Sequence, residues 1–88
     1  LAAEELFSAR AEFIARVSTS VLKDLMDVLL QKRVINEREK ESIPALPRAD
    51  KAEGLIDMVL RKGNPACRLL IDIFCEVDPF LSAQLKLN

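Results

Sequence analysis

The chain has 88 residues, of which 50% are apolar, 5% are aromatic and 31% are charged. This length supports one small domain with one hydrophobic core, and it leaves no room for a second lobe around a substrate cleft. The 13 Lys and Arg residues nearly balance the 14 Asp and Glu residues, which argues against a nucleic-acid-binding protein. No apolar run approaches the roughly 18 residues needed to cross a bilayer, so we expect a soluble domain with protein partners.

The first two helices are predicted from apolar residues at helical spacing. An amphipathic helix is expected from about residue 4 to residue 17. The segment "STS" at 18–20 then offers N-cap residues for a second helix. The apolar stripe of this second helix consists of Leu22, Leu25, Met26, Leu29 and Leu30.

The next two helices are bounded by capping residues and prolines. Asn36 and Glu39 have the spacing of a capping box and predict a short third helix of about two turns, which Pro44 and Pro47 prevent from continuing. A fourth helix begins near Pro47 and stops at Gly63. Its apolar stripe consists of Ala52, Leu55, Ile56, Val59 and Leu60.

The fifth helix, from Pro65 to about Val77, is expected to form the centre of the core. It is apolar on nearly every side, and its polar residues Arg68, Asp72 and Glu76 form one narrow stripe. A last short helix follows Asp78 and Pro79. Six helices without a strand pattern predict an all-α bundle. Its large core residues are expected to be Phe7, Phe13, Phe74 and Phe80.

The residue types needed for catalysis or metal binding are largely missing. The chain has no His, which removes the commonest general base and zinc ligand, and the loop at Gly63 lacks a phosphate-binding motif. Cys67 and Cys75 lie roughly 12 Å apart along one predicted helix, too far for a disulfide, and are expected to be buried thiols. We therefore expect no catalytic residue, metal, cofactor or small-molecule substrate. The N-terminus does not have the pattern of a signal peptide, so a cytoplasmic location is expected.

The charged residues are segregated by helix. Asp24 and Asp27 lie on the second helix, whereas Arg10 lies on the first and Lys51 on the fourth. One interpretation is that these residues only form solvated helix surfaces. The alternative is that a basic and an acidic surface allow head-to-tail contacts between copies, which would produce filaments.

Four segments resemble a known interaction domain in order and spacing. They are "FIARV" at 13–17, "LMDVLLQKRVIN" at 25–36, "DKAEGLIDMVLRKGNPAC" at 50–67 and "FCEVDPFLSAQLKL" at 74–87. From Phe13 to Leu87 the chain resembles a caspase recruitment domain (CARD) of the death-domain superfamily. It is most similar to the prodomains of inflammatory caspases and to their CARD-only relatives.

This resemblance implies a six-helix antiparallel Greek-key bundle with a bent first helix, formed by a single domain over residues 1–88 with its core at 6–87. It also implies that Arg10 and Lys51 contribute to a basic surface, and that Asp24 and Asp27 contribute to an opposing acidic surface. Further candidates for the interface are Glu39, Arg48 and Arg61. The chain departs from many relatives at Glu53, where they have a basic residue near that point of the fourth helix.

The function implied is homotypic CARD–CARD binding in an inflammatory caspase-activating assembly, the inflammasome. The partners would be the CARDs of an adaptor, a sensor, a caspase or further copies of this chain, with no nucleic acid and no membrane involved. The chain would be the prodomain of a caspase whose protease domain lies outside these residues, or alternatively a CARD-only decoy, an adaptor or a sensor. An enzyme fragment or a DNA-binding helical domain is the alternative from another class. The missing His and the absence of a basic recognition helix argue against it.

Overall fold

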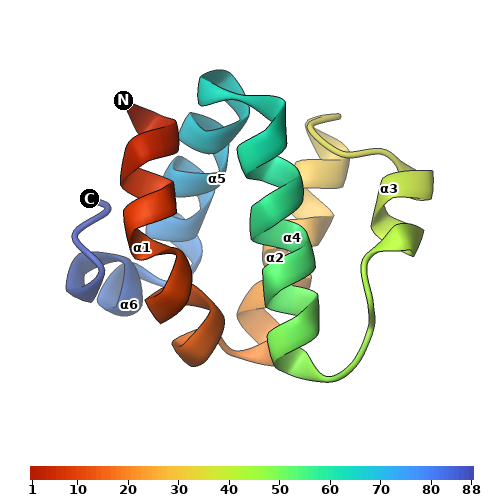
Figure 1. The fold of residues 1–88 in the computed structure, drawn as a ribbon, viewed down its shortest axis with the longest axis horizontal. Helices are drawn as coiled ribbons and strands as arrows, with labels where there is room; N and C mark the ends of the chain where they lie inside the picture. The colour runs from red at the N-terminus through yellow and green to blue at the C-terminus, as the bar shows by residue number, and fades with distance from the viewer.

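The structure is a computed structural model that describes all residues from 1 to 88, and it is helical throughout apart from the connecting loops (Figure 1). The predicted all-α fold with six helices is confirmed. The first helix is one uninterrupted element, and none of the helices is long and apolar enough to cross a membrane. The elements are α1 (Ala2–Arg16), α2 (Thr19–Gln31), α3 (Glu37–Ser42), α4 (Arg48–Lys62), α5 (Asn64–Val77) and α6 (Pro79–Gln84).

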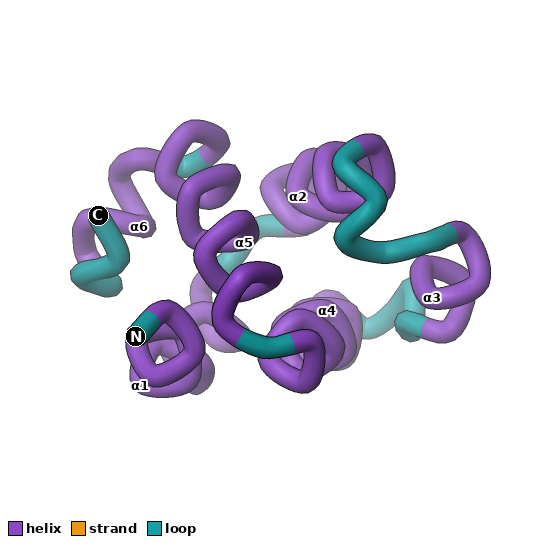
Figure 2. The backbone as a smooth tube through the Cα atoms, turned by 90° about the horizontal axis from the view of Figure 1, so that it is seen from above, coloured by secondary structure: helices purple, strands orange, loops and turns teal.

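Helix α5 forms the centre of the bundle, as its composition predicts. It packs against α1, α2, α4 and α6, and Figure 2 shows it surrounded by these four helices while α3 lies at the periphery. Its three polar residues remain exposed. The residues that α5 buries are Ala66, Cys67, Leu70, Ile71, Ile73 and Phe74.

Two of the four phenylalanines form an aromatic pair in the core. Phe13 of α1 and Phe74 of α5 are fully buried, with ring centroids 5.3 Å apart and planes at 78°. This edge-to-face arrangement brings the positive edge of one ring to the negative face of the other.

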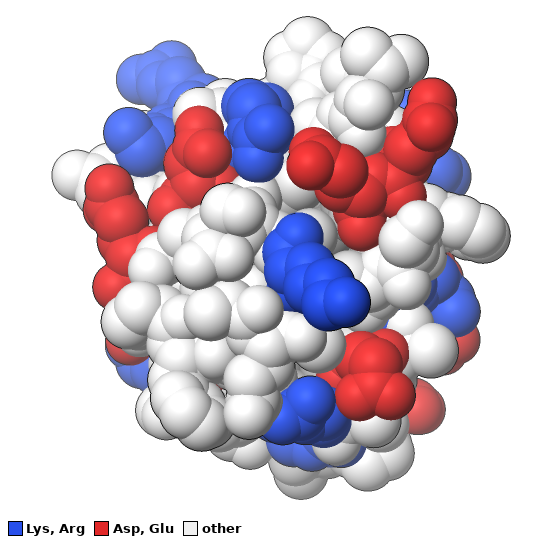
Figure 3. Space-filling view, turned by 90° about the vertical axis from the view of Figure 1, so that its left-hand side faces the viewer, with Lys and Arg blue, Asp and Glu red and all other residues white.

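The prediction that Phe7 and Phe80 belong to the core is wrong, because 67% and 74% of these residues are exposed. On α1 the buried stripe includes Leu6, and the next residue in a helix points about 100° away from it. On α6 the buried positions are Leu81 and Ser82, which follow Phe80. The side of the molecule that carries α1 and α6 shows a broad uncharged area between charged side chains (Figure 3).

The helix ends follow the local signals in the sequence. The predicted capping box is present, since Asn36 accepts a hydrogen bond from the Glu39 backbone at 2.8 Å and Glu39 accepts one from the Asn36 backbone at 2.9 Å. Gly63 joins α4 to α5 with a φ of 97°, a conformation that favours glycine because it has no Cβ atom. Local sequence signals therefore account for the start of α3 and for the junction between α4 and α5.

Candidate protein-interaction surfaces

Arg10 is held by two carboxylates of α4. Its Nε donates to Asp57 Oδ1 at 2.7 Å, and its Nη2 donates to Asp57 Oδ2 at 2.9 Å and to Glu53 Oε2 at 3.1 Å. The guanidinium therefore binds Asp57 in the bidentate geometry that strengthens such pairs. Hydrogen bonding to Arg10, with the attraction of its charge, lowers the pKa of Asp57. The same contact raises the pKa of Arg10.

This arrangement changes the character of the expected basic surface. Glu53, where the resemblance implies a basic residue in many relatives, lies beside Arg10 and partly offsets its positive charge. Asp50, one turn earlier on α4, is exposed and takes part in no ion pair. The carboxylates at 50, 53 and 57 follow helical spacing of three and four residues and so share one side of α4.

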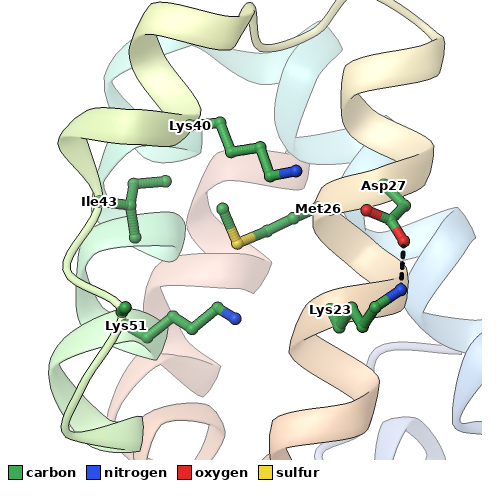
Figure 4. Close-up of a pocket in the computed structure, with 7 residues that line it drawn as sticks. Lys23, Met26, Asp27, Lys40, Ile43 and Lys51 are labelled. Carbon is green, nitrogen blue, oxygen red and sulfur yellow. Dashed lines mark hydrogen bonds and ion pairs between the residues drawn. The ribbon is translucent and has the colours of Figure 1, made fainter.

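A hollow of about 330 Å³ opens between α2, α3 and the start of α4 (Figure 4). Lys51 and Asp27 both line it, although the family resemblance implies that these two residues belong to opposing surfaces. Lys51 lies in the hollow because each residue of a helix is rotated about 100° from the one before it. This rotation places Lys51 on a different side of α4 from the residues that hold Arg10. The lining residues are Lys23, Met26, Asp27, Lys40, Ile43, Ala45 and Lys51.

The hollow combines an apolar floor with a mostly basic rim. Met26 and Ile43 are 4% and 7% exposed. Lys23 donates a hydrogen bond of 2.9 Å to Asp27 Oδ2, and this contact lowers the pKa of Asp27, with smaller effects from Lys40 and Lys51. Lys40 and Lys51 are half-buried and form no ion pair. Figure 4 shows their ammonium groups on the side of the hollow that holds Met26.

The other predicted interface residues lie apart from one another. Asp24 is exposed on α2 and does not line the hollow, although its charge helps to raise the pKa of Lys23. Glu39 forms an ion pair of 2.7 Å with Lys62 in addition to its role in the capping box. Arg61 is exposed, and its charge makes a small contribution to lowering the pKa of Asp57.

Arg48 has structural partners within the chain. Its Nη1 donates to the backbone oxygens of Ile14 at 2.6 Å and of Val17 at 3.0 Å, and its Nη2 donates to that of Ala15 at 3.4 Å. The last carbonyl groups of a helix have no partner within it, so Arg48 satisfies the end of α1 from a distant part of the sequence. Its role in an interface stays a prediction.

Four residues of these surfaces were not selected from the sequence as site residues: Lys23, Lys40, Glu53 as a partner of Arg10, and Asp57. Two signals were available for some of them. Lys23 precedes Asp27 by four residues, and Glu53 precedes Asp57 by four, so each pair shares a side of its helix. No local signal relates Lys40 to the hollow, since α3 and α2 are brought together only by the fold.

Comparisons with known proteins cover almost the whole chain. The family model described as "Caspase recruitment domain" matches residues 4–88. Caspase-1 of Equus caballus is 41% identical over 90 residues, which include all of this chain and 22% of the horse protein. Two Homo sapiens proteins, putative caspase recruitment domain-containing protein 17P and caspase recruitment domain-containing protein 16, are each 36% identical over the whole chain. The chain covers 82% of the first human protein and 46% of the second. No solved structure matches.

Proposed function

Since the chain belongs to the caspase recruitment domain family, we propose that it is a homotypic CARD–CARD interaction module of an inflammatory caspase-activating assembly. A domain of this family is a protein-interaction module and not an enzyme. In the form we favour, the chain is the prodomain of an inflammatory caspase and acts in the cytoplasm. Its partners are the CARDs of an adaptor or a sensor, together with further copies of itself.

The mechanism we propose is proximity. Contacts between CARDs concentrate the protease domains attached to them, and this raised effective concentration promotes protease dimerisation without any chemistry in the CARD itself. The protease activity would lie outside these residues, because the chain spans about a fifth of the length of the caspase-1 relatives.

The observation that carries this proposal is the similarity to caspase-1 over the full length of the chain, from the first helix to the last. The charged surfaces support it. Arg10 with its carboxylate partners and the hollow around Asp27 lie on different sides of α4, so one molecule can contact two neighbours. Asp24, beside the hollow, and Lys51, within it, are included in this second surface.

A CARD-only decoy, which occupies a partner without bringing a protease, is the second candidate function. It is favoured by the similarity to putative caspase recruitment domain-containing protein 17P, most of whose length the chain covers. An adaptor or sensor CARD would use the same binding surfaces. Determining the coding sequence that follows residue 88 distinguishes a protease domain from a stop codon or another domain.

The proximity mechanism can be tested by fusing the chain to a caspase-1 protease domain. We expect the fusion to cleave a fluorogenic substrate at a lower protein concentration than a matched fusion that carries Leu29→Ala, which removes a fully buried side chain of α2. Purified CARDs from caspase-1 and an inflammasome adaptor should compete when added in excess. Equal activity of both fusions, together with no binding to either CARD, would contradict the proposal.

A further inference from the structure

The family resemblance implies a basic surface around Arg10 and an acidic surface around Asp27, but the charged groups around each of these residues have the opposite net sign. We call the first the α4 ridge and define it by Asp50, Glu53 and Asp57. Arg10 and Arg61 neutralise only part of it, because three carboxylates stand against two guanidinium groups. The ridge is therefore net acidic where a basic surface is expected, and its most accessible carboxylates are those of Asp50 and Glu53.

The second surface is the hollow, which holds Asp27 of the expected acidic surface and yet is net basic. Its rim has three lysines and one aspartate, a net charge of +2. Asp27 is already bound to Lys23, so the ammonium groups of Lys40 and Lys51 are left without a carboxylate partner. Asp24 is outside the lining, although its charge acts on Lys23, which is part of it.

The size and the floor of the hollow suit side chains of a protein. Its volume of about 330 Å³ is at the lower end of the range for clefts that hold whole ligands, about 300–1,000 Å³. The buried Met26 and Ile43 provide an apolar surface for the methylene groups of an acidic side chain. Lys40 and Lys51 approach the hollow from α3 and α4 on the same side (Figure 4), so both can reach its carboxylate.

We propose that the hollow of one copy binds the α4 ridge of a second copy, with Asp50 and Glu53 of the ridge paired to Lys40 and Lys51. This inference rests on the proposed function, and it assigns the polarity of the contact: α4 supplies the acidic side chains and the hollow supplies the basic ones. A second copy fits this contact because every copy carries both an acidic ridge and a basic hollow.

The contact is open-ended because the two surfaces cannot meet within one molecule. At about 100° per residue, Lys51 lies about 100° from Asp50 and about 160° from Glu53 around the axis of α4, so one α4 cannot pair its own ridge with its own hollow. Each copy therefore offers its ridge to one neighbour and its hollow to another. Such a heterologous contact adds copies in one direction and forms a chain or filament unless the rotation between copies closes a ring.

The opposite polarity, with a basic α4 surface bound to acidic groups around Asp27, makes the opposite prediction. Under that polarity, acidic substitutions in the hollow and basic substitutions on the ridge would strengthen the contact. Under the polarity proposed here, each set of substitutions weakens it. The sign of the effect therefore decides between the two.

The test uses charge reversal of each surface. The hollow variant is Lys40→Glu with Lys51→Glu, and the ridge variant is Asp50→Lys with Glu53→Lys. Self-assembly is followed by light scattering over a concentration series at physiological salt. The matched control is Lys32→Glu with Lys86→Glu, two exposed lysines without ion pairs on other parts of the surface.

We expect each reversed variant to need roughly tenfold or more protein for the same scattering, while the control matches the unmodified domain. An equal mixture of the two reversed variants should recover assembly, since each variant's altered surface complements the other's. Circular dichroism checks the fold of each variant. Because Glu53 also contacts Arg10, Asp50→Lys alone is measured as a second ridge variant.

Several outcomes would overturn the contact. These are unchanged or stronger assembly by the folded hollow variant, no recovery in the mixture, or no self-association by the unmodified domain at any concentration. If the hollow variant loses binding to an adaptor CARD but still self-assembles, the occupant is a different CARD and the contact between copies is wrong. The proposed function fails separately, when the unmodified domain neither binds a CARD nor activates the fused protease.

Discussion

Replacing Arg48 should destabilise the domain more than replacing any other arginine that lacks carboxylate partners. The guanidinium of Arg48 donates to the carbonyl oxygens of Ile14, Ala15 and Val17, and it is half-buried against the end of α1. These contacts join the start of α4 to the end of α1, and they place a positive charge at the negative end of the α1 helix dipole.

The magnitude follows from the hydrogen bonds that Arg48→Ala removes. A hydrogen bond that involves a charged group contributes about 1.5–3 kcal/mol, and two of the three contacts have good distances of 2.6 and 3.0 Å. Water can replace part of this interaction because the site is not fully buried. We therefore expect a loss of about 2–3 kcal/mol, which corresponds to a decrease in Tm of about 10–20 °C for a domain of this size.

Thermal unfolding followed by circular dichroism provides the measurement, with Arg61→Ala as the matched control. Arg61 is exposed and forms no ion pair, so its replacement should change stability by less than about 0.5 kcal/mol. Arg48→Lys should recover only part of the loss, since one ammonium group cannot reproduce the planar set of guanidinium donors. If Arg48→Ala melted within about 3 °C of the unmodified domain, the contact with α1 would not contribute to stability as argued.

Three further predictions concern the core, the cysteines and pH. Leu29→Ala should cost about 2–5 kcal/mol, because Leu29 is fully buried, and a melting curve that barely moves would refute its assignment to the core. Cys67 is fully buried, and burial raises the pKa of its thiol. In native buffer a thiol reagent should therefore label the half-buried Cys75 first. Equal labelling rates for the two cysteines would contradict this order. The contact with Lys62 and the capping hydrogen bond with Asn36 lower the pKa of Glu39 in the folded domain. The ionised carboxylate therefore stabilises the fold fully at a pH above the pKa that Glu39 has in the unfolded chain. This stabilisation is lost as the pH falls through the lower pKa of the folded state. Glu39→Gln should therefore reduce stability at about pH 7 and have little effect at about pH 2, as measured by urea unfolding at both values.

The sequence predicts the helices well because their signals are local. The capping box at Asn36 and Glu39, the stripe that includes Leu29 and the apolar composition of α5 all depend on residues within a few positions of one another. The same local reasoning fails for Phe7 and Phe80. A phenylalanine at the edge of an amphipathic stripe is buried only if a neighbouring helix covers that edge, and this depends on the packing of α1 and α6.

The charged surfaces depend on the tertiary structure for the same reason. The sequence identifies Arg10, Lys51 and Asp27 as charged residues of an interaction domain. The effect of each charge depends on the groups that the fold places beside it. Arg10 meets carboxylates that lie 43 and 47 residues later in the chain, and Lys51 shares a hollow with Asp27. The sequence by itself determined the six helices and the family, because helix formation and segment order are local properties. Only the packing of α1 against α4, and the placement of α3 beside α2 and the start of α4, decided which charges are neutralised and which remain free to bind, because those distances are set by residues far apart in the chain.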